Sequence, residues 1–152
     1  MSPFRWASRV YWEDTDGGGI VYYANYLRFL ERGRTEWLRS LGYSQRALAQ
    51  EPGIVFAVVS LNIEYRKPAK LDDELVITCE PTLEGAATIV FAQAIYRGER
   101  TGEQSDKRNL LVEAAARVAC LDARTHRPKR LPEFLTQAAS PTGPRSNIKE
   151  PS

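Results

Sequence analysis

The sequence predicts an α+β fold in which a curved antiparallel sheet packs on one long helix. One strand-like segment precedes a long amphipathic helix, and four further strand-like segments follow it, each bounded by turn residues. The 152 residues, of which 43% are hydrophobic and 26% charged, fit one domain that can bury a core without metal or disulfide. One helix covers only one face of a sheet, so we expect the sheet to pair with another subunit.

The composition excludes several classes of function. The 21 Lys and Arg residues nearly balance the 19 Asp and Glu residues, so the strongly basic surface of a nucleic-acid-binding protein is missing. Cys79, Cys120 and the single histidine, His126, lack metal-ligand spacing, and both cysteines are expected in the core. No segment has the ~18 apolar residues of a membrane span, and the N-terminus lacks a signal peptide's apolar region. We therefore expect a cytoplasmic protein that neither spans a membrane nor binds nucleic acid or metal.

An acidic, glycine-rich turn separates the first strand from the helix. Phe4–Glu13 is rich in Trp, Tyr and Val, which favours a strand, and Asp14–Gly19 breaks it because three consecutive glycines form a permissive turn. A helix is expected from about Tyr23 to Leu41, where Gly42 can end it. Gly33 on its apolar stripe indicates the close approach of another backbone. The stripe consists of apolar or small residues at helical spacing: Tyr22, Tyr26, Phe29, Leu30, Gly33, Trp37, Leu38 and Leu41.

A short helix and four strands follow. Ser44 can cap a helix at residues 45–50. Strands are expected at residues 55–66, 71–80, 86–97 and 110–122, and Pro81 suggests an edge or bulge near the end of the second of them. In the first of these strands all odd-numbered positions are apolar or aromatic, which predicts one face buried throughout. Charged residues at 98–108 predict a flexible loop, so the domain is expected at 1–135 and a disordered polar tail at 136–152.

The turn before the helix has the chemistry of a hydrolytic site. Asp14 and Asp16 place two carboxylates on a loop, and the helix begins seven residues after Asp16. The first N–H groups of a helix lack internal partners and can stabilise an oxyanion, while a carboxylate opposite can attack a carbonyl or activate water. A thioester suits so simple a site because it has a good leaving group. The same residues also fit a capped loop without any catalytic role.

A resemblance to a known family extends this interpretation. The segment from Glu13 to Leu38, with Asp-Thr-Asp-Gly-Gly-Gly followed by Tyr-Tyr-Ala-Asn-Tyr, resembles the signature of the hotdog-fold acyl-CoA thioesterases of the 4-hydroxybenzoyl-CoA thioesterase superfamily. It is most similar to the YbgC-type branch, which is associated with the Tol-Pal cell-envelope system. Glu64–Leu75 matches the family's second recurrent stretch, and the resemblance covers about Phe4–Leu135. It implies a hotdog fold, a five-stranded antiparallel sheet wrapped around one long helix, and a homodimer or tetramer with sites between subunits.

The resemblance also implies the site residues, with no cofactor and no metal. Asp16 corresponds to the catalytic aspartate, and Tyr23 to the residue at the helix start whose N–H faces the thioester carbonyl. Members of the YbgC-type branch usually have His at the position of Tyr23 and Tyr at that of Trp12. The candidate substrate-binding residues are Gly19, Asn25, Arg66 and Lys67. Further cations that suit coenzyme A phosphates, or an ordinary solvated surface, are Lys70, Arg127, Lys129 and Arg130.

The activity implied is hydrolysis of acyl-CoA to free acid and coenzyme A. Two alternatives remain. The first is a non-catalytic acyl-binding scaffold of an envelope or lipid-synthesis complex, which the departures at Tyr23 and Trp12 favour. The second is a thioesterase acting on acyl carrier protein, whose acidic surface the basic residues would meet. Asp14, Glu31 and His126 are expected to be a turn residue, a solvated helix residue and a loop residue.

Overall fold

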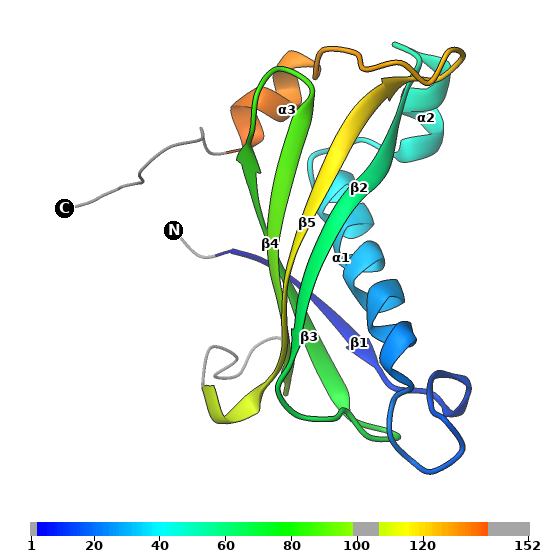
Figure 1. Cartoon of the computed structure of the whole chain (residues 1–152), viewed down its shortest axis with the longest axis vertical. Helices are drawn as coiled ribbons and strands as arrows, with labels where there is room; N and C mark the ends of the chain where they lie inside the picture. Colours follow the sequence, from blue (N-terminus) through cyan, green and yellow to red (C-terminus); the bar gives the residue numbers. More distant parts are fainter. Residues whose placement is uncertain (1–2, 99–106, 140–152) are drawn as a thin grey trace, which may run out of the picture.

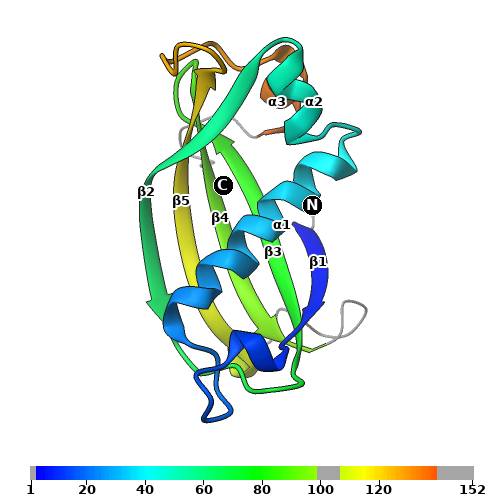
Figure 2. The same ribbon diagram turned by 90° about the vertical axis from the view of Figure 1, so that its right-hand side faces the viewer.

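A five-stranded antiparallel sheet curves around one long helix in the computed structural model, which describes residues 3–98 and 107–139. Helix α1 (Tyr26–Ser40) lies across one face of the sheet, and α2 (Gln45–Gln50) and α3 (Glu133–Ala138) both lie at the same end of the sheet (Figures 1 and 2). The strand order is β1-β3-β4-β5-β2. The strands are β1 (Phe4–Arg9), β2 (Ile54–Tyr65), β3 (Glu74–Leu83), β4 (Thr88–Arg97) and β5 (Leu110–Asp122).

This architecture confirms the predicted fold class. The predicted long helix is a 3₁₀ turn, η2 (Tyr23–Asn25), that continues into α1. The side chain of Ser44 accepts the Ala47 N–H at 3.1 Å and so caps α2 as expected. The first strand is shorter than expected, because a 3₁₀ turn, η1 (Trp12–Asp14), replaces its second half, and β3 begins three residues later.

The core lies between α1 and the sheet. The stripe of α1 that faces the sheet is buried as its spacing predicted, from Tyr26 to Leu38. On the sheet side the even-numbered residues of β5 from Val112 to Cys120 alternate inward. Trp37 and Phe91 meet edge to face, with ring centroids 5.4 Å apart. Cys79 and Cys120 are both buried free thiols, and burial raises the pKa of Cys79 to about 12, so they are core residues as expected.

The prediction of one continuously buried face on β2 is wrong. A bulge shifts the pairing with β5 between Val58 and Ser60, so the odd-numbered residues face α1 only after the bulge. Before it, Phe56 and Val58 pair with the inward-facing Cys120 and Val118. Because β2 is also a sheet edge that α1 covers only in part, Val59 is 57% exposed and Leu61 and Tyr65 are also exposed.

Two expectations based on Gly and Pro have different outcomes. An added Cβ on Gly33 would lie 2.6 Å from Ile77 Cγ2 and 3.2 Å from Gln93 Nε2, so the close approach is real, but side chains and not another backbone make it. Pro81 lies in β3 beyond Cys79, the last residue paired with β1, and among the described residues β3 is paired there only with β4. Pro81 is therefore at a local edge, as predicted.

Helix α3 extends past the expected end of the domain. It continues to Ala138, and Ala139 is buried, so residues 136–139 of the predicted tail belong to the packed structure. The rest of that tail, residues 140–152, lies outside the described residues, as does most of the predicted loop at 98–108.

Candidate active site

Asp16 lies on an exposed hairpin that leads into α1. Thr15 and Val21 form a β-bridge, and the Asp16 N–H donates to the Ile20 carbonyl at 3.0 Å, so residues 17–19 form the tip. Gly17 and Gly19 have φ values of +87° and +94°, which favour glycine at both positions. The Gly18 N–H donates to Asp16 Oδ1 at 2.7 Å. This bond holds one carboxylate oxygen, and the side chain remains open to solvent.

The hairpin ends in the turn that contains Tyr23. The Tyr22 N–H donates to the Asp14 carbonyl at 3.1 Å, and the Asn25 N–H donates to the Tyr22 carbonyl at 2.8 Å. Among the described residues no hydrogen bond engages the N–H of Tyr23 itself. The acceptor on its own peptide group, the Tyr22 carbonyl, is occupied, and this polarises the Tyr23 N–H as a donor. The turn therefore presents an available N–H at the start of the helix.

Asp14 and Asn25 tie the hairpin to the turn. Asp14 is 5% exposed, and its Oδ2 accepts the Tyr11 N–H at 2.8 Å, which is the role of a turn residue that we expected. Its backbone carbonyl accepts a second bond from Asn25 Nδ2 at 2.9 Å. Asn25 was predicted to bind substrate, but its amide N–H₂ is used within the chain, where it joins the segment before Asp16 to the segment after Tyr23.

Lys70 lies beside the hairpin. Val21 N–H donates to Ala69 O and Leu71 N–H donates to Gly19 O, both at 2.9 Å, and Ile20 bridges to Lys70. Facing positions on three adjacent extended segments are thus occupied by Asp16, Ile20 and Lys70. Their side chains therefore lie on the same face of these paired segments. Two strand spacings separate the backbones of Asp16 and Lys70 by about 10 Å. All three side chains are exposed.

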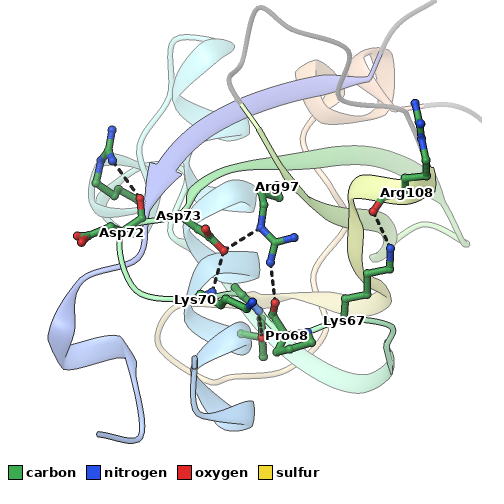
Figure 3. Close-up of polar contacts among 10 residues, drawn as sticks. Lys67, Pro68, Lys70, Asp72, Asp73, Arg97 and Arg108 are labelled. Carbon is green, nitrogen blue, oxygen red and sulfur yellow. Dashed lines mark hydrogen bonds and ion pairs between the residues drawn. The ribbon is translucent and has the colours of Figure 1, made fainter. Parts of the chain in front are cut away.

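The cations predicted to bind substrate have partners within the chain. Arg66 forms an ion pair with Glu113 at 2.9 Å, and Lys67 Nζ donates to the Arg108 carbonyl at 2.8 Å. Figure 3 shows Lys67 pointing to Arg108, while Arg97 bridges Asp73 and the Pro68 carbonyl. Within the described residues Lys70 is held only through its backbone, whose N–H donates to Asp73 Oδ2 at 2.8 Å. Among the described residues its ammonium group has no hydrogen bond or ion pair, so it is open to a ligand.

A cavity of about 120 Å³ lies between α1 and the sheet. It begins at Glu31, five residues beyond the start of α1 at Tyr26, or roughly 8 Å along the helix axis. Arg34 donates to Gln93 Oε1 at 3.0 Å, and burial lowers the pKa of Arg34 while Glu31 opposes that shift. Glu31 accepts a hydrogen bond from the Thr35 hydroxyl at 2.5 Å and is one of the residues that line the cavity. The walls are mainly apolar: Trp37, Leu38, Phe56, Val58, Ile89, Phe91, Val118 and Leu135.

The remaining polar candidates lie away from this hairpin. His126 is an exposed residue in the turn after β5 with φ of +61° and donates its N–H to the Asp122 carbonyl, as expected of a loop residue. Lys129 is engaged by Pro52 O and Asp122. Within residues 3–98 and 107–139 no group of His, Cys, Asp and Glu has the geometry of a metal site. No helix in the same residues is long and apolar enough to cross a membrane.

Sequence reasoning missed two contributors to this region, Tyr65 and the cavity. The Tyr65 hydroxyl donates to the Tyr23 carbonyl at 3.3 Å, although the two residues are 42 positions apart. An aromatic residue at the end of the alternating pattern of β2 was a signal for Tyr65. The cavity gave no signal, because its lining comes from three strands and three helices.

The fold and the hairpin together define a class of protein. A sheet wrapped around one helix, with an acidic glycine-rich loop leading into that helix, is the architecture of the hotdog-fold thioesterases. A mutant 4-hydroxybenzoyl-CoA thioesterase complexed with 4-hydroxybenzoyl-CoA has this fold, with a TM-score of 0.78 at 22% identity over 91% of this chain and all of that one. A probable thioesterase from Bartonella henselae aligns with a TM-score of 0.76 at 34% identity, covering 86% of this chain and 100% of that one.

Sequence comparison gives the family. The model of the thioesterase superfamily matches residues 18–103. The acyl-CoA thioester hydrolase YbgC of Escherichia coli O6:H1 is 45% identical over 132 residues, which are 87% of this chain and 92% of that protein. The acyl-CoA thioesterase YbgC of Haemophilus influenzae is 41% identical over 135 residues, which are 89% of this chain and 93% of that one. The chain belongs to the thioesterase superfamily, as its motifs indicated.

Proposed function

We propose that this protein is an acyl-CoA thioesterase that hydrolyses acyl-CoA to the free acid and coenzyme A. The observation behind this proposal is one hairpin that joins an exposed carboxylate, Asp16, to a turn in which the backbone N–H of Tyr23 has no hydrogen bond to any described residue. The Tyr23 N–H polarises the thioester carbonyl and stabilises the oxyanion that forms on its oxygen. Because a backbone N–H makes this contact, a tyrosine side chain at position 23 is compatible with the chemistry.

Two routes share this geometry. In the first, an Asp16 carboxylate oxygen bonds to the thioester carbon, the C–S bond breaks, and coenzyme A leaves as a thiolate that takes up a proton; water then hydrolyses the anhydride. In the second, Asp16 accepts a proton from water as that water attacks the same carbon; the C–S bond then breaks, and coenzyme A leaves as a thiolate that takes up the proton. A single turnover in ¹⁸O-labelled water tests for the first route, because label enters the Asp16 carboxylate only when water attacks the Asp16 carbonyl of an anhydride.

The cavity and the basic residues support binding of both halves of the substrate. An apolar cavity beside α1 gives the acyl group a place out of water. Gly19, in the tip of the Asp16 hairpin, and Lys70, beside the hairpin, are the contacts that we propose for the coenzyme A portion. Arg66 and Lys67 can contribute only if their bonds to Glu113 and Arg108 open. Asn25 maintains the hairpin from within.

The test is coenzyme A release from short, medium, long and aromatic acyl-CoAs. We expect Asp16→Asn to lower kcat by at least about 100-fold, as for loss of a catalytic base or nucleophile. Glu13→Gln, which neutralises a neighbouring exposed carboxylate, is the matched control and should retain activity. Tyr23→Phe should also retain activity because the backbone donor remains.

Other outcomes identify the alternatives. Acyl-CoA binding that persists in Asp16→Asn, with no turnover in either protein, would identify an acyl-binding scaffold. Faster hydrolysis of acyl groups on acyl carrier protein than on coenzyme A would identify the carrier as the substrate. Absence of hydrolysis that depends on Asp16 for any thioester would overturn the proposed function.

The same proposal includes a homodimer or tetramer in the cytoplasm. Its support is the exposed apolar edge of β2, at Val58, Val59 and Leu61, and the family resemblance, which implies a site between subunits. An unpaired edge strand with apolar side chains favours pairing with a second copy.

A further inference from the structure

One side chain outside the hairpin, that of Tyr65, contacts the turn at Tyr23 in two ways. Its hydroxyl donates to the Tyr23 carbonyl at 3.3 Å, and its ring meets the Tyr23 ring edge to face, with centroids 6.4 Å apart and planes at 88°. The same ring packs on Tyr26 at 5.5 Å. Tyr65 therefore touches both the 3₁₀ turn that contains Tyr23 and the first residue of α1.

The sheet brings Tyr65 to this place. Tyr65 is the last residue of β2 and pairs with Val112 of β5, whose side chain is buried on the face toward α1. Tyr65 therefore points to the same side. The strand that it ends, β2, finishes at the end of the sheet where α1 begins (Figure 2). The Tyr26 ring against which it packs is itself anchored, because the Tyr26 hydroxyl accepts the Ala69 N–H at 2.9 Å.

The stability of the fold does not by itself require the hydrogen bond from the Tyr65 hydroxyl to the Tyr23 carbonyl. The side chain is 46% exposed, so water could satisfy the hydroxyl equally well. Its partner is a carbonyl next to the one N–H group on which the proposed oxyanion contact depends. Burial and the neighbouring Tyr23 raise the pKa of Tyr65, so the phenol keeps its proton at neutral pH and remains a donor. At 3.3 Å the bond is long, and such bonds shorten when substrate fills a site.

We propose that Tyr65 is a positioning residue of the thioesterase site. Tyr65 holds Tyr23 through the Tyr23 carbonyl and the Tyr23 ring, and the Asn25 N–H holds the carbonyl of Tyr22. The Tyr22–Tyr23 peptide therefore has one orientation, in which the Tyr23 N–H points to the substrate. Tyr65 itself does not touch the reacting atoms. The inference rests on the proposed function and adds to it the residue that fixes its oxyanion donor.

Steady-state kinetics of three variants test the proposal. Tyr65→Phe removes only the hydroxyl, and we expect kcat to fall about fivefold with KM unchanged, as for loss of one modest hydrogen bond in the transition state. Tyr65→Leu also removes the ring contact and should lower kcat further. Tyr43→Phe is the matched control, because Tyr43 is also exposed and stacked on an aromatic ring, that of Phe134, at the other end of α1.

A second measurement does not depend on activity. The ¹³C shift of the Tyr23 carbonyl and the amide shift of Tyr23 should change in Tyr65→Phe and not in Tyr43→Phe. The proposal is overturned by wild-type kcat in Tyr65→Leu, by an effect confined to KM, or by Tyr23 shifts that ignore Tyr65. If the wild-type protein hydrolyses no thioester, the proposed function fails, and the NMR shifts still report whether Tyr65 holds Tyr23.

Discussion

At the residue scale, intramolecular contacts decide which cations can meet a ligand. Arg66 and Lys67 stood out in the sequence as neighbouring charges, yet each has a partner in the chain, whereas the ammonium of Lys70 has none among the described residues. Exposed ion pairs such as Arg66–Glu113 stabilise a protein by only about 0–1 kcal/mol, so they report geometry more than stability. What matters here is that both positive charges already have partners within the chain.

We therefore predict different effects of removing these cations. Lys70→Ala should raise KM for acyl-CoA about tenfold at unchanged kcat, the loss expected for one charge-assisted phosphate contact. Arg66→Ala should change KM much less, because Glu113 already occupies its guanidinium. Initial rates at two salt concentrations measure both, since salt should weaken the Lys70 contact selectively. Equal KM increases in the two variants would contradict this assignment.

A second residue-scale prediction concerns acid stability. Asp122 Oδ1 accepts hydrogen bonds from the backbone N–H groups of Arg124 and Thr125 at 2.8 and 3.0 Å. These bonds hold the pKa of Asp122 below its usual value, and the bond from Thr125 has the larger effect. A carboxylate whose pKa is lower in the folded protein than in the unfolded chain stabilises the fold at pH values above its unfolded-state pKa. This contribution is lost as the pH falls through the folded-state pKa. The urea concentration at the unfolding midpoint should therefore fall more steeply below about pH 4 in the wild type than in Asp122→Asn. Parallel curves would show that the turn contributes nothing.

At the scale of elements, α1 and the sheet approach closely at one point. Gln93 is buried and donates from Nε2 to the Leu30 carbonyl at 3.0 Å, which is a side-chain bond from β4 to the helix backbone. Gly33 lies one turn further along, where Ile77 and Gln93 leave no room for a Cβ. The glycine allows this approach at the expense of helix propensity.

Gly33→Ala should consequently destabilise the fold. Alanine improves helix propensity by about 1 kcal/mol, but a Cβ 2.6 Å from Ile77 Cγ2 is far inside van der Waals contact and forces a shift that costs about 2–3 kcal/mol, the upper part of the usual range for overpacking. We expect a net loss of about 1–2 kcal/mol in the free energy of unfolding, measured by urea titration. Arg28→Ala on the exposed face of the same helix serves as the control and should change stability by less than about 0.5 kcal/mol. An unchanged or higher stability of Gly33→Ala would contradict the packing described here.

At the scale of the whole molecule, the two edges of the sheet differ. β1 is short and its exposed residues are small or charged, whereas β2 is twice as long and exposes Val58, Val59 and Leu61. Long apolar edges are rare in soluble monomers because they invite strand pairing. This asymmetry favours a dimer joined at β2.

A charge at the β2 edge should break that dimer. Val59→Lys adds a cation at a 57% exposed bulge residue, where it is tolerated by the monomer and repelled by its copy across a two-fold axis. We expect light scattering to show a smaller mass and thioesterase activity to fall with it. Ala7→Lys on the β1 edge is the control and should keep both. A wild-type monomer with full activity would exclude the dimer.

The sequence by itself determined the features that depend on neighbouring residues. Helical spacing after residue 22, alternation in β5 and the glycine turn before Tyr23 are local patterns, so they predicted the helix, the sheet and the segment from Asp16 to Tyr23. Only the tertiary structure decided what depends on residues far apart. The bulge changes which residues of β2 face α1, and Tyr65 reaches Tyr23 from 42 positions away. Side chains from β3 and β4 approach α1 so closely at residue 33 that only glycine fits there. Such contacts follow from register and packing, which spacing along the chain does not specify.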